Sequence, residues 1–393
     1  MLPTLKNLGD LKSKRVLVRV DFNVPLKGGR VPPGAEWRLR AVLPTLDYLA
    51  GRGARIIILS HLGRPQGKKD LRYSLYPVFL KLARLWPKGQ LVFGDDVIGS
   101  RMIKLSKSLK NGQAALLENL RFYSGEEDND PAFAQELSRL GEFYVNDAFA
   151  ASHRDHASIV GLPKLLKSAA GLLLEKEVAV LSAVRNKPRR PLVFILGGAK
   201  AETKLGLVKE FLPKSEAIVL GGVLANTLLF ARGIAVGRSL IEERLISEAK
   251  KLELTSSRLH LPVDVVVSKS LTVASGVAVK PVGRVAADEY IVDVGPDTAQ
   301  LFEKVIKTAR MIIWNGTMGL TEIQPFRAGS MPVARSVAGV SAEKIVGGGD
   351  LINFLAEENL LDKMTYVSTG GGAMMEFLAG ETLPGIAALE KPY

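Results

Sequence analysis

A run of three glycines near the end of the chain leads into a segment of good helix formers. The glycines are Gly370, Gly371 and Gly372, and the segment that follows reaches Leu378. Glycine removes the Cβ atoms that would keep a ligand away from the backbone, and the first N–H groups of a helix attract an anion. The pattern therefore predicts a phosphate site, although a plain strand-to-helix turn would show the same residues.

Basic and polar side chains occur at the ends of four apolar segments in the first half of the sequence. Each segment has the composition of a buried or half-buried strand. Because the carboxyl ends of parallel strands meet at one edge of a sheet, where ligands bind, we expect these side chains to form one site. For Arg19 and Asp21 the alternative is a simple salt bridge. The side chains are Arg19, Asp21 and Asn23, then His61 and Arg64, then Arg121, then His153, Arg154 and His156.

Small residues, mostly glycines, close the apolar segments of the second half. We expect strands at 192–196, 217–220, 263–267, 311–314, 344–346 and 364–368. The glycines occur at strand ends and never in a Gly/Ser-rich tract, which excludes a flexible linker. Lys200 follows one glycine pair and enters a predicted helix, an arrangement similar to a phosphate loop without the full motif of one.

Alternation of strands and helices predicts an α/β fold with parallel sheets flanked by helices on both faces. At 393 residues the chain exceeds what one core usually organises, so we expect two domains. A helix predicted over 169–186 lies where the charge balance changes, and we place the connection between the domains there, after a first domain of 1–168. The acidic stretch 124–130 is expected to be a surface loop.

The net charge of +13 is concentrated in the first half. Residues 1–170 carry 27 Lys and Arg against 16 Asp and Glu, a net charge of +11, whereas the remainder carries 26 against 24, a net charge of +2. Such an imbalance attracts a nucleic acid or a small, highly charged metabolite. A nucleic-acid surface would usually add a basic helix or stacked aromatic residues, and the sequence has neither.

Several classes of protein are excluded by composition. Without cysteine the chain has no disulfide, zinc-thiolate site or thiol nucleophile. It has no signal-peptide pattern at its start and no run of about 18 uncharged apolar residues. We therefore expect a soluble, cytoplasmic protein.

Phosphoryl transfer is the chemistry that these residues suit. It depends on aligned ligands, on Arg and Lys to neutralise charge, and on a divalent metal that bridges phosphate oxygens. Lys200, Lys204 and Asp350 of the second half, together with its glycine-rich loops, suit a phosphorylated ligand. No Ser-His-Asp order or paired-carboxylate site stands out. A phosphorylated histidine at His61, His153 or His156 is the less favoured route, because an anionic acceptor needs no nucleophilic relay.

In order and spacing, several segments resemble those of phosphoglycerate kinases over nearly the whole chain, from Arg15 to Gly385. The resemblance implies two Rossmann-like lobes separated by a cleft and joined by a long helix. It also implies that 376–393 returns to the first lobe, so that the second domain is 187–375. The segments are Arg19–Pro25, Ser60–Pro65, Glu118–Phe122, Gly197–Lys200, Trp314–Gly316, Gly347–Asp350 and Ser368–Gly372.

The activity implied by this resemblance is reversible phosphoryl transfer from 1,3-bisphosphoglycerate to ADP, giving 3-phosphoglycerate and ATP. Transfer would be direct and in line after domain closure, with Mg²⁺ as cofactor. The implied partners are these substrates, with no membrane and no specific nucleic acid, and the protein is expected to be a monomer.

Site residues follow from the resemblance position by position. Phosphoglycerate would be held by Asp21, Asn23, Arg38, His61, Arg64, Arg121 and Arg154. The catalytic residues would be Arg38, Lys200, Gly371 and Gly372, with Arg38 and Lys200 neutralising the group in flight. Lys204 would meet the nucleotide phosphates, Glu322 the ribose, and Asp350 the metal. The nucleotide would be held by Gly198, Ala199, Lys200, Lys204, Gly221, Gly222, Asn315, Glu322, Gly348, Asp350, Gly371 and Gly372.

The sequence departs from the family pattern mainly on the nucleotide side. Thr317 replaces a usual proline, Thr203 a usual acidic residue and Leu351 a common threonine, which leaves the nucleotide preference open. The segment Pro32–Glu36 also differs. Two alternatives are a non-catalytic anion or nucleic-acid binder on the same fold, and another phosphotransferase with a carboxylate acceptor. Retention of both Arg38 and Lys200 argues against the binder.

Overall fold

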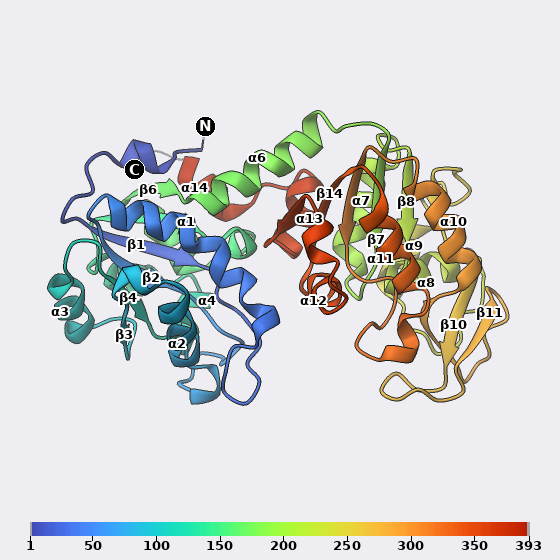
Figure 1. Ribbon diagram of the computed structural model, residues 1–393, viewed down its shortest axis with the longest axis horizontal. Helices are drawn as coiled ribbons and strands as arrows, with labels where there is room; N and C mark the ends of the chain where they lie inside the picture. Colours follow the sequence, from blue (N-terminus) through green and yellow to red (C-terminus); the bar gives the residue numbers. More distant parts are fainter. Residues whose placement is uncertain (1, 391–393) are drawn as a thin grey trace. The chain divides into compact units, whose positions relative to one another are not determined.

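Residues 2–390 are described by the structure, a computed structural model shown in Figure 1. The chain divides into two compact units. Unit 1 consists of the residues up to Leu181 together with those from Glu381 onward, and unit 2 consists of Ser182–Gly380. The chain passes from unit 1 to unit 2 within helix α6 (Leu172–Asn186) and returns after Gly380.

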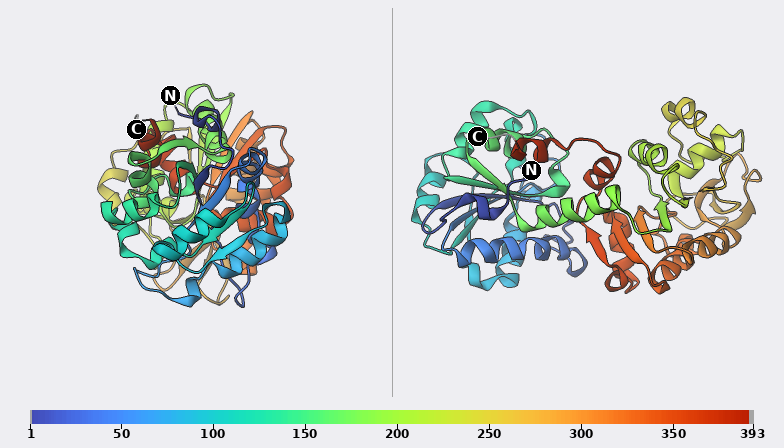
Figure 2. Two further views of the ribbon diagram at one scale, coloured as in Figure 1. Left: turned by 90° about the vertical axis from the view of Figure 1, so that its left-hand side faces the viewer. Right: turned by 90° about the horizontal axis from the view of Figure 1, so that it is seen from above.

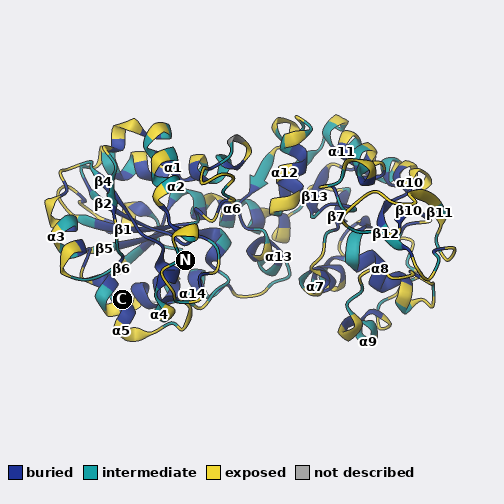
Figure 3. Ribbon diagram, turned by 90° about the horizontal axis from the view of Figure 1, so that it is seen from below, coloured by how far each residue is buried: buried dark blue, intermediate teal, exposed yellow. Residues whose placement is uncertain are grey.

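Unit 1 is built on a six-stranded sheet with the strand order β3-β4-β2-β1-β5-β6, in which every neighbouring pair is parallel. Its central strands are buried on both faces, as the dark blue arrows of Figure 3 show. Such strands are near-continuous apolar runs, and their positions could therefore be predicted from the sequence. The strands are β1 (Arg15–Val20), β2 (Arg55–Leu59), β3 (Val92–Gly94), β4 (Ala114–Leu117), β5 (Phe143–Asp147) and β6 (Lys167–Ala170).

Helices cover both faces of this sheet, and the returning end of the chain completes unit 1. Helix α14 (Pro384–Glu390), dark red in Figure 2, packs against β6 and a short π-helical segment at Ala157–Gly161. The Gly385 N–H donates to the Ser152 carbonyl at 2.8 Å. Residues 376–380 belong instead to unit 2. The other helices that begin in unit 1 are α1 (Trp37–Gly51), α2 (Tyr76–Leu85), α3 (Ser100–Ser108), α4 (Ser124–Glu127), α5 (Pro131–Ser138) and α6.

Unit 2 repeats the architecture with the strand order β15-β14-β13-β7-β8-β9, again parallel throughout. Its strands are β7 (Leu192–Leu196), β8 (Ala217–Leu220), β9 (Leu259–His260), β13 (Met311–Asn315), β14 (Glu343–Gly347) and β15 (Tyr366–Ser368). Its helices are α7 (Ala201–Phe211), α8 (Gly222–Ala231), α9 (Ile246–Ala249), α10 (Pro296–Ile306), α11 (Ser330–Gly339), α12 (Gly349–Glu357) and α13 (Gly372–Leu378). The expected α/β class with two parallel sheets is confirmed.

One strand expected in the parallel sheet lies elsewhere. The segment predicted at 263–267 forms β10 (Asp264–Ser268), the centre of a separate antiparallel sheet with β11 (Ala278–Pro281) and β12 (Tyr290–Val294). Both faces of β10 are buried, with Val265 and Val267 in one apolar cluster and Val266 in another. A strand buried on both faces has the same apolar pattern in a parallel sheet as in an antiparallel one. The prediction was therefore wrong, because this pattern does not distinguish the two kinds of sheet.

The start of the predicted helix at 169–186 was also wrong. Ala169 and Ala170 end β6, where they pair with β5, and helix α6 begins at Leu172. Asp147, the last residue of β5, terminates the strand pairing and caps the helix. Its Oδ1 accepts the N–H groups of Leu173 and Leu174 at 2.9 and 3.1 Å. Alanine is a good helix former, so its β-sheet pairing here is set by the tertiary structure.

Among residues 2–390, no helix has both the length and the hydropathy that a membrane span requires.

Asp147 gives a prediction about stability and pH. Burial raises its pKa to about 7, so the folded protein keeps this proton up to that pH, whereas the unfolded chain releases it near pH 4. The group therefore lowers stability as the pH rises from about 4 to about 7. Asp147→Asn keeps an acceptor for the helix N–H groups but does not titrate. We expect the free energy of unfolding of the variant, relative to the original, to increase across this window by at most about 1.4 kcal/mol per pH unit.

Urea unfolding at several pH values measures this difference. Asp128→Asn, at an exposed carboxylate of the same unit, is the matched control. A flat difference for Asp147→Asn would contradict the prediction.

Candidate active site

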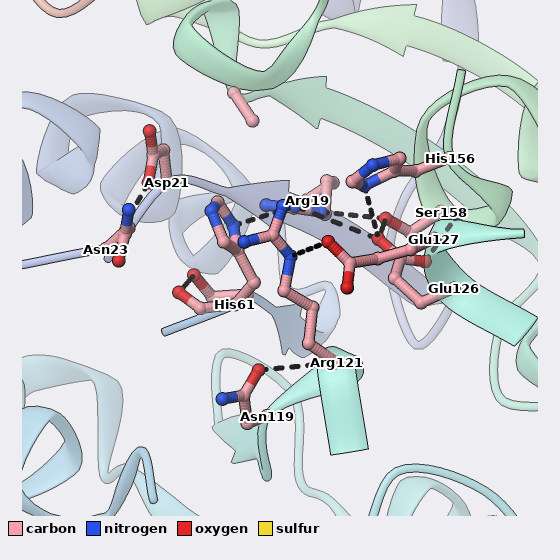
Figure 4. A network of polar contacts seen from close by, with 12 residues as sticks. Arg19, Asp21, Asn23, His61, Asn119, Arg121, Glu126, Glu127, His156 and Ser158 are labelled. Atoms are coloured by element: carbon pink, nitrogen blue, oxygen red, sulfur yellow. Dashed lines mark hydrogen bonds and ion pairs between the residues drawn. The ribbon is translucent and has the colours of Figure 1, made fainter. Parts of the chain in front are cut away.

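A buried arginine at the carboxyl end of β1 organises the site region of unit 1 (Figure 4). Arg19 donates from Nε to the Ser158 hydroxyl at 2.8 Å, and its Nη2 lies 3.9 Å from Glu126 Oε1. The same Nη2 lies 3.1 Å from His61 Nδ1. Neither Arg19 nor Glu126 is exposed, so each charge depends on the other.

His61 is held as a neutral imidazole. Burial is the main cause, and the nearby cations Arg19 and Arg154 act in the same direction to hold the pKa of His61 well below its usual value. Because the arginine can only donate, Nδ1 of His61 accepts and the proton belongs on Nε2. The ring therefore offers a neutral N–H donor, as an anionic ligand requires.

A chain of hydrogen bonds joins the other residues expected to bind the substrate. Arg38 donates to Asp21 at 3.1 Å, and Asp21 accepts the N–H of Asn23 at 2.9 Å. The Oδ1 of the Asn23 side chain accepts the N–H of Gly63 at 2.9 Å, and the Gly63 backbone carbonyl accepts from Arg121 at 2.7 Å. The ends of β1, β2 and β4 are thereby tied together, as the strand-end pattern predicted. Asp21 pairs with Arg38, not with Arg19.

Arg64, Arg154 and Arg121 are the other cations of this set. Arg64 is exposed, directly after Gly63, and Arg154 lies near enough to His61 to affect its pKa. Arg121 is buried, and its Nε meets Glu127 at 3.1 Å as an ion pair without hydrogen-bond geometry. A phosphate oxygen could replace this partner.

Glu126 is the residue that sequence reasoning missed. The stretch 124–130 was expected to be a surface loop, but 124–127 forms helix α4 and Glu126 is fully buried. Burial alone would raise its pKa, yet His156, Arg19 and Ser158 together hold the pKa below its usual value. The expectation failed because a local acidic run does not reveal that one member faces a buried arginine over a hundred residues away in the chain.

The segment Pro32–Glu36, which differs from the family pattern, leads into α1 through a short 3-10 turn. Glu36 bridges Lys81 at 2.7 Å and Arg40 at 3.0 Å. This acidic residue therefore anchors the start of the helix that carries Arg38.

In unit 2, three loops at the carboxyl ends of the strands contact one another through their backbones. The Gly198 N–H donates to the Thr317 carbonyl at 2.7 Å, and the Gly222 N–H donates to the Met318 carbonyl at 2.8 Å. A Cβ on Gly222, whose φ is +60°, would lie 2.6 Å from the Gly198 nitrogen. Any other residue at Gly222 would push these loops apart.

A buried lysine lies beneath these loops. Lys204 is 5% exposed and donates from Nζ to the Lys200 carbonyl at 3.0 Å. Burial, and then the charge of Lys200, lower the pKa of Lys204 to about 8, while Asp350 acts in the opposite direction. Lys200 and Asp350 are both exposed, at the starts of α7 and α12. The two lysines can together attract an anion, and the Asp350 carboxylate can meet a cation bound to that anion.

The other expected nucleotide residues surround this point. A cavity of about 200 Å³ is lined in part by Gly198, Ala199, Gly222, Glu322 and Asp350. Asn315 is 5% exposed, and its Nδ2 is buried with no hydrogen bond to any described residue. A Cβ added to Gly348 would lie 3.5 Å from this nitrogen, so the two residues are neighbours. This buried donor is therefore able to bind an acceptor group of a ligand.

Gly371 and Gly372 begin α13, which packs against α7. Gly371 has a φ of +50°, and a Cβ on either glycine would meet no other group within 4 Å. Gly221 lies between β8 and α8, and its N–H donates to the Leu196 carbonyl. The departures from the family pattern are placed as follows: Thr317 donates to the Gly319 carbonyl, Leu351 is fully buried in the apolar core, and Thr203 lies in α7.

The chain has two α/β units, each built on a parallel sheet. One unit has arginines at its strand ends, and the other has glycine loops and two lysines. This combination is typical of a phosphoryl-transfer kinase. The sequence model of the phosphoglycerate kinase family matches residues 5–381. The chain belongs to the phosphoglycerate kinase family, which confirms the resemblance found in its motifs.

Similar proteins of known name cover nearly all of the chain. It is 45% identical over 391 residues to the phosphoglycerate kinase of Thermomicrobium roseum, with 98% of each chain covered. It is 45% identical over 383 residues to that of Rubrobacter xylanophilus, covering 97% of this chain and 96% of the relative. The non-catalytic alternative is therefore not favoured.

Two solved structures share the fold over 99% of this chain. The phosphoglycerate kinase of Pyrococcus horikoshii OT3 is 30% identical with a TM-score of 0.85 and is covered over 98% of its chain. That of Coxiella burnetii is 38% identical with a TM-score of 0.80 and is covered over 99% of its chain.

The buried pair of Arg19 and Glu126 gives a prediction about stability. Glu126→Gln leaves the arginine charge buried without a counter-charge, so we expect the free energy of unfolding to fall by about 3 to 5 kcal/mol. Urea unfolding measures the change. The control is Glu136→Gln, which removes a surface ion pair with Arg139 and should change stability by less than about 1 kcal/mol. Equal effects of the two substitutions would mean that Arg19 does not depend on Glu126.

Proposed function

We propose that this protein catalyses reversible phosphoryl transfer from 1,3-bisphosphoglycerate to ADP, giving 3-phosphoglycerate and ATP. The observation that carries the proposal is membership of the phosphoglycerate kinase family over residues 5–381. Arg38 and Lys200, the two cations that the family pattern aims at the transferring group, are both present.

Unit 1 would bind phosphoglycerate. Its phosphate and carboxylate oxygens suit the guanidinium groups of Arg38, Arg64, Arg121 and Arg154, which can donate two parallel hydrogen bonds each. Asp21 and Asn23 would orient the hydroxyl end and the loop at Gly63, since they already hold Arg38 and the Gly63 N–H. His61 would add its neutral Nε2–H. Glu127 would give up Arg121 when the ligand arrives.

Unit 2 would bind the nucleotide. Gly198, Ala199, Gly221 and Gly222 would lie against its base and sugar, and Glu322 would accept from the ribose. Asn315, Gly348, Gly371 and Gly372 would approach the phosphates, and the unpaired Nδ2 of Asn315 supports a ligand there. Lys204 is mostly buried, and a phosphate beside it would favour its charged form.

Magnesium fits this half of the site. Mg²⁺ is usually held by one or two carboxylates together with substrate phosphates rather than by an all-protein cage. Asp350 provides one exposed carboxylate near Lys204, and no group of three potential metal ligands occurs within residues 2–390. We propose that Asp350 holds the metal, which would bridge nucleotide phosphate oxygens and offset their charge.

No residue is assigned as a general base, because none is required. The acceptor is a phosphate oxygen of ADP in one direction and the carboxylate of phosphoglycerate in the other, and both are already anionic. Arg38 and Lys200 would instead neutralise the charge on the group in flight, which passes directly between the two ligands.

We further propose that unit 1, expected at 1–168 with the returning end of the chain, is the phosphoglycerate domain, that helix α6 connects the domains, and that unit 2, expected at 187–375 and extending to Gly380, is the nucleotide domain. Transfer would follow closure of the two domains, since neither half-site alone aligns both ligands. The enzyme is proposed to act as a monomer in the cytoplasm.

Purified protein given ATP, Mg²⁺ and 3-phosphoglycerate should form an acyl phosphate that hydroxylamine traps. Lys200→Ala removes charge neutralisation in the transition state, and we expect its turnover to fall by about 100-fold or more. The control is Lys250→Ala, at an exposed lysine outside the site, which should leave turnover unchanged. No trapped product above the level of the Lys200→Ala variant would overturn the proposed function. Running the assay with several nucleotides measures the preference that Thr203, Thr317 and Leu351 leave open.

Gly372→Ala tests the glycine-rich start of α13. A Cβ there meets no protein atom within 4 Å, so the fold should tolerate it, but the methyl group would occupy space proposed for a phosphate. We expect turnover to fall by about tenfold or more while the Kd for 3-phosphoglycerate, measured by calorimetry, stays the same. Gly339→Ala, at the end of α11 and equally open, is the control. Equal loss of turnover and of phosphoglycerate binding would mean that Gly372 does not serve the nucleotide.

A further inference from the structure

A second concave site occurs in unit 2, at the amino ends of the same strands whose carboxyl ends carry the nucleotide loops. Its volume is about 1000 Å³. It is lined by residues that precede or begin four adjacent strands, β7, β13, β14 and β15. The lining consists of Arg189, Arg190, Pro191, Arg310, Ser341, Ala342, Glu343, Lys344, Lys363, Met364 and Thr365.

Five of these residues are cations and one is an anion, so the hollow carries a net charge of +4. Arg189 pairs with Glu343 at 3.4 Å, and Arg190 pairs with Glu216 at 2.7 Å. Arg310 and Lys363 are exposed and make no ion pair within residues 2–390. The hollow therefore has two cations free to bind and two more whose surface pairs are weak.

Lys344 is the half-buried cation among the residues that line the hollow. Its Nζ donates to the carbonyls of Val340 at 3.1 Å and Ala338 at 3.5 Å, at the end of α11. Burial, and then the charge of Lys363, hold the pKa of Lys344 below its usual value. The charge of Lys363 thus disfavours the charged form of Lys344, and a bound anion would oppose this effect.

The hollow is separate from the proposed nucleotide site. Strands β7, β13 and β14 are each five residues long, so their two ends are about 16 Å apart. None of the residues assigned to phosphoglycerate, nucleotide or metal lines the hollow.

We propose that this hollow, defined by Arg189, Arg190, Arg310, Lys344 and Lys363, binds a small polyphosphate anion carrying three or more negative charges. Three of its five cations are arginines, whose planar groups donate two parallel hydrogen bonds to a phosphate. Adjacent phosphate groups match the charge density of the hollow better than a single phosphate does.

Calorimetric titration with inorganic tripolyphosphate tests the proposal, with 3-phosphoglycerate and ADP present at saturation to fill the substrate sites. We expect one bound tripolyphosphate per chain, weakened by added salt. The double substitution Arg310→Glu and Lys363→Glu should weaken binding by about tenfold or more while turnover stays unchanged. Lys250→Glu with Lys304→Glu changes the net charge equally at exposed residues outside the hollow, and should leave the affinity within about twofold.

Four results would overturn the proposal. They are no binding under these conditions, equal weakening by both double substitutions, citrate binding as tightly as tripolyphosphate, and a DNA oligonucleotide binding more tightly than tripolyphosphate at Arg310 and Lys363. The last result would assign the hollow to a nucleic acid instead.

Discussion

The ion pair between Arg19 and Glu126 is the constraint on which the first half-site depends. A buried guanidinium at the end of β1 is tolerable only because a buried carboxylate and the Ser158 hydroxyl meet it. Once fixed, Arg19 determines which nitrogen of His61 accepts and which donates. The residues proposed to touch phosphoglycerate therefore rest on residues that do not touch it.

The two units prepare for anions by different physical means. Unit 1 fixes two of its cations with a carboxylate and a carbonyl, so that Arg38 and Arg121 are oriented before any ligand arrives. Unit 2 removes side chains so that backbone loops approach closely, and leaves Lys204 and the Asn315 amide partly unsatisfied. A nucleotide phosphate would accept hydrogen bonds from both groups and so remove the free-energy cost of leaving them unsatisfied.

Much of this was predictable from sequence because strand ends in parallel sheets follow a simple rule. The apolar runs before Arg19, His61 and Arg121 gave both the strands and the edge where their ends meet. Glu126, the sheet of β10 and the end of β6 were not predictable, since each depends on a partner distant in the chain. Arg19 faces a carboxylate on α4, and Ala170 pairs with Asn146. Local composition carries no information about such partners.

In unit 2 the amino ends of the strands also carry charged side chains, although the ligands of parallel sheets usually bind at the carboxyl ends. At the carboxyl ends of β7, β13 and β14 the chain places glycines, and at their amino ends it places Arg190, Arg310 and Lys344. Cations gathered at an edge with no substrate role raise the electrostatic free energy of the folded state. Pairing with Glu216 and Glu343 relieves part of that repulsion. Arg310 and Lys363 remain without an ion pair among the described residues, and a multivalent anion is the simplest group that would balance them.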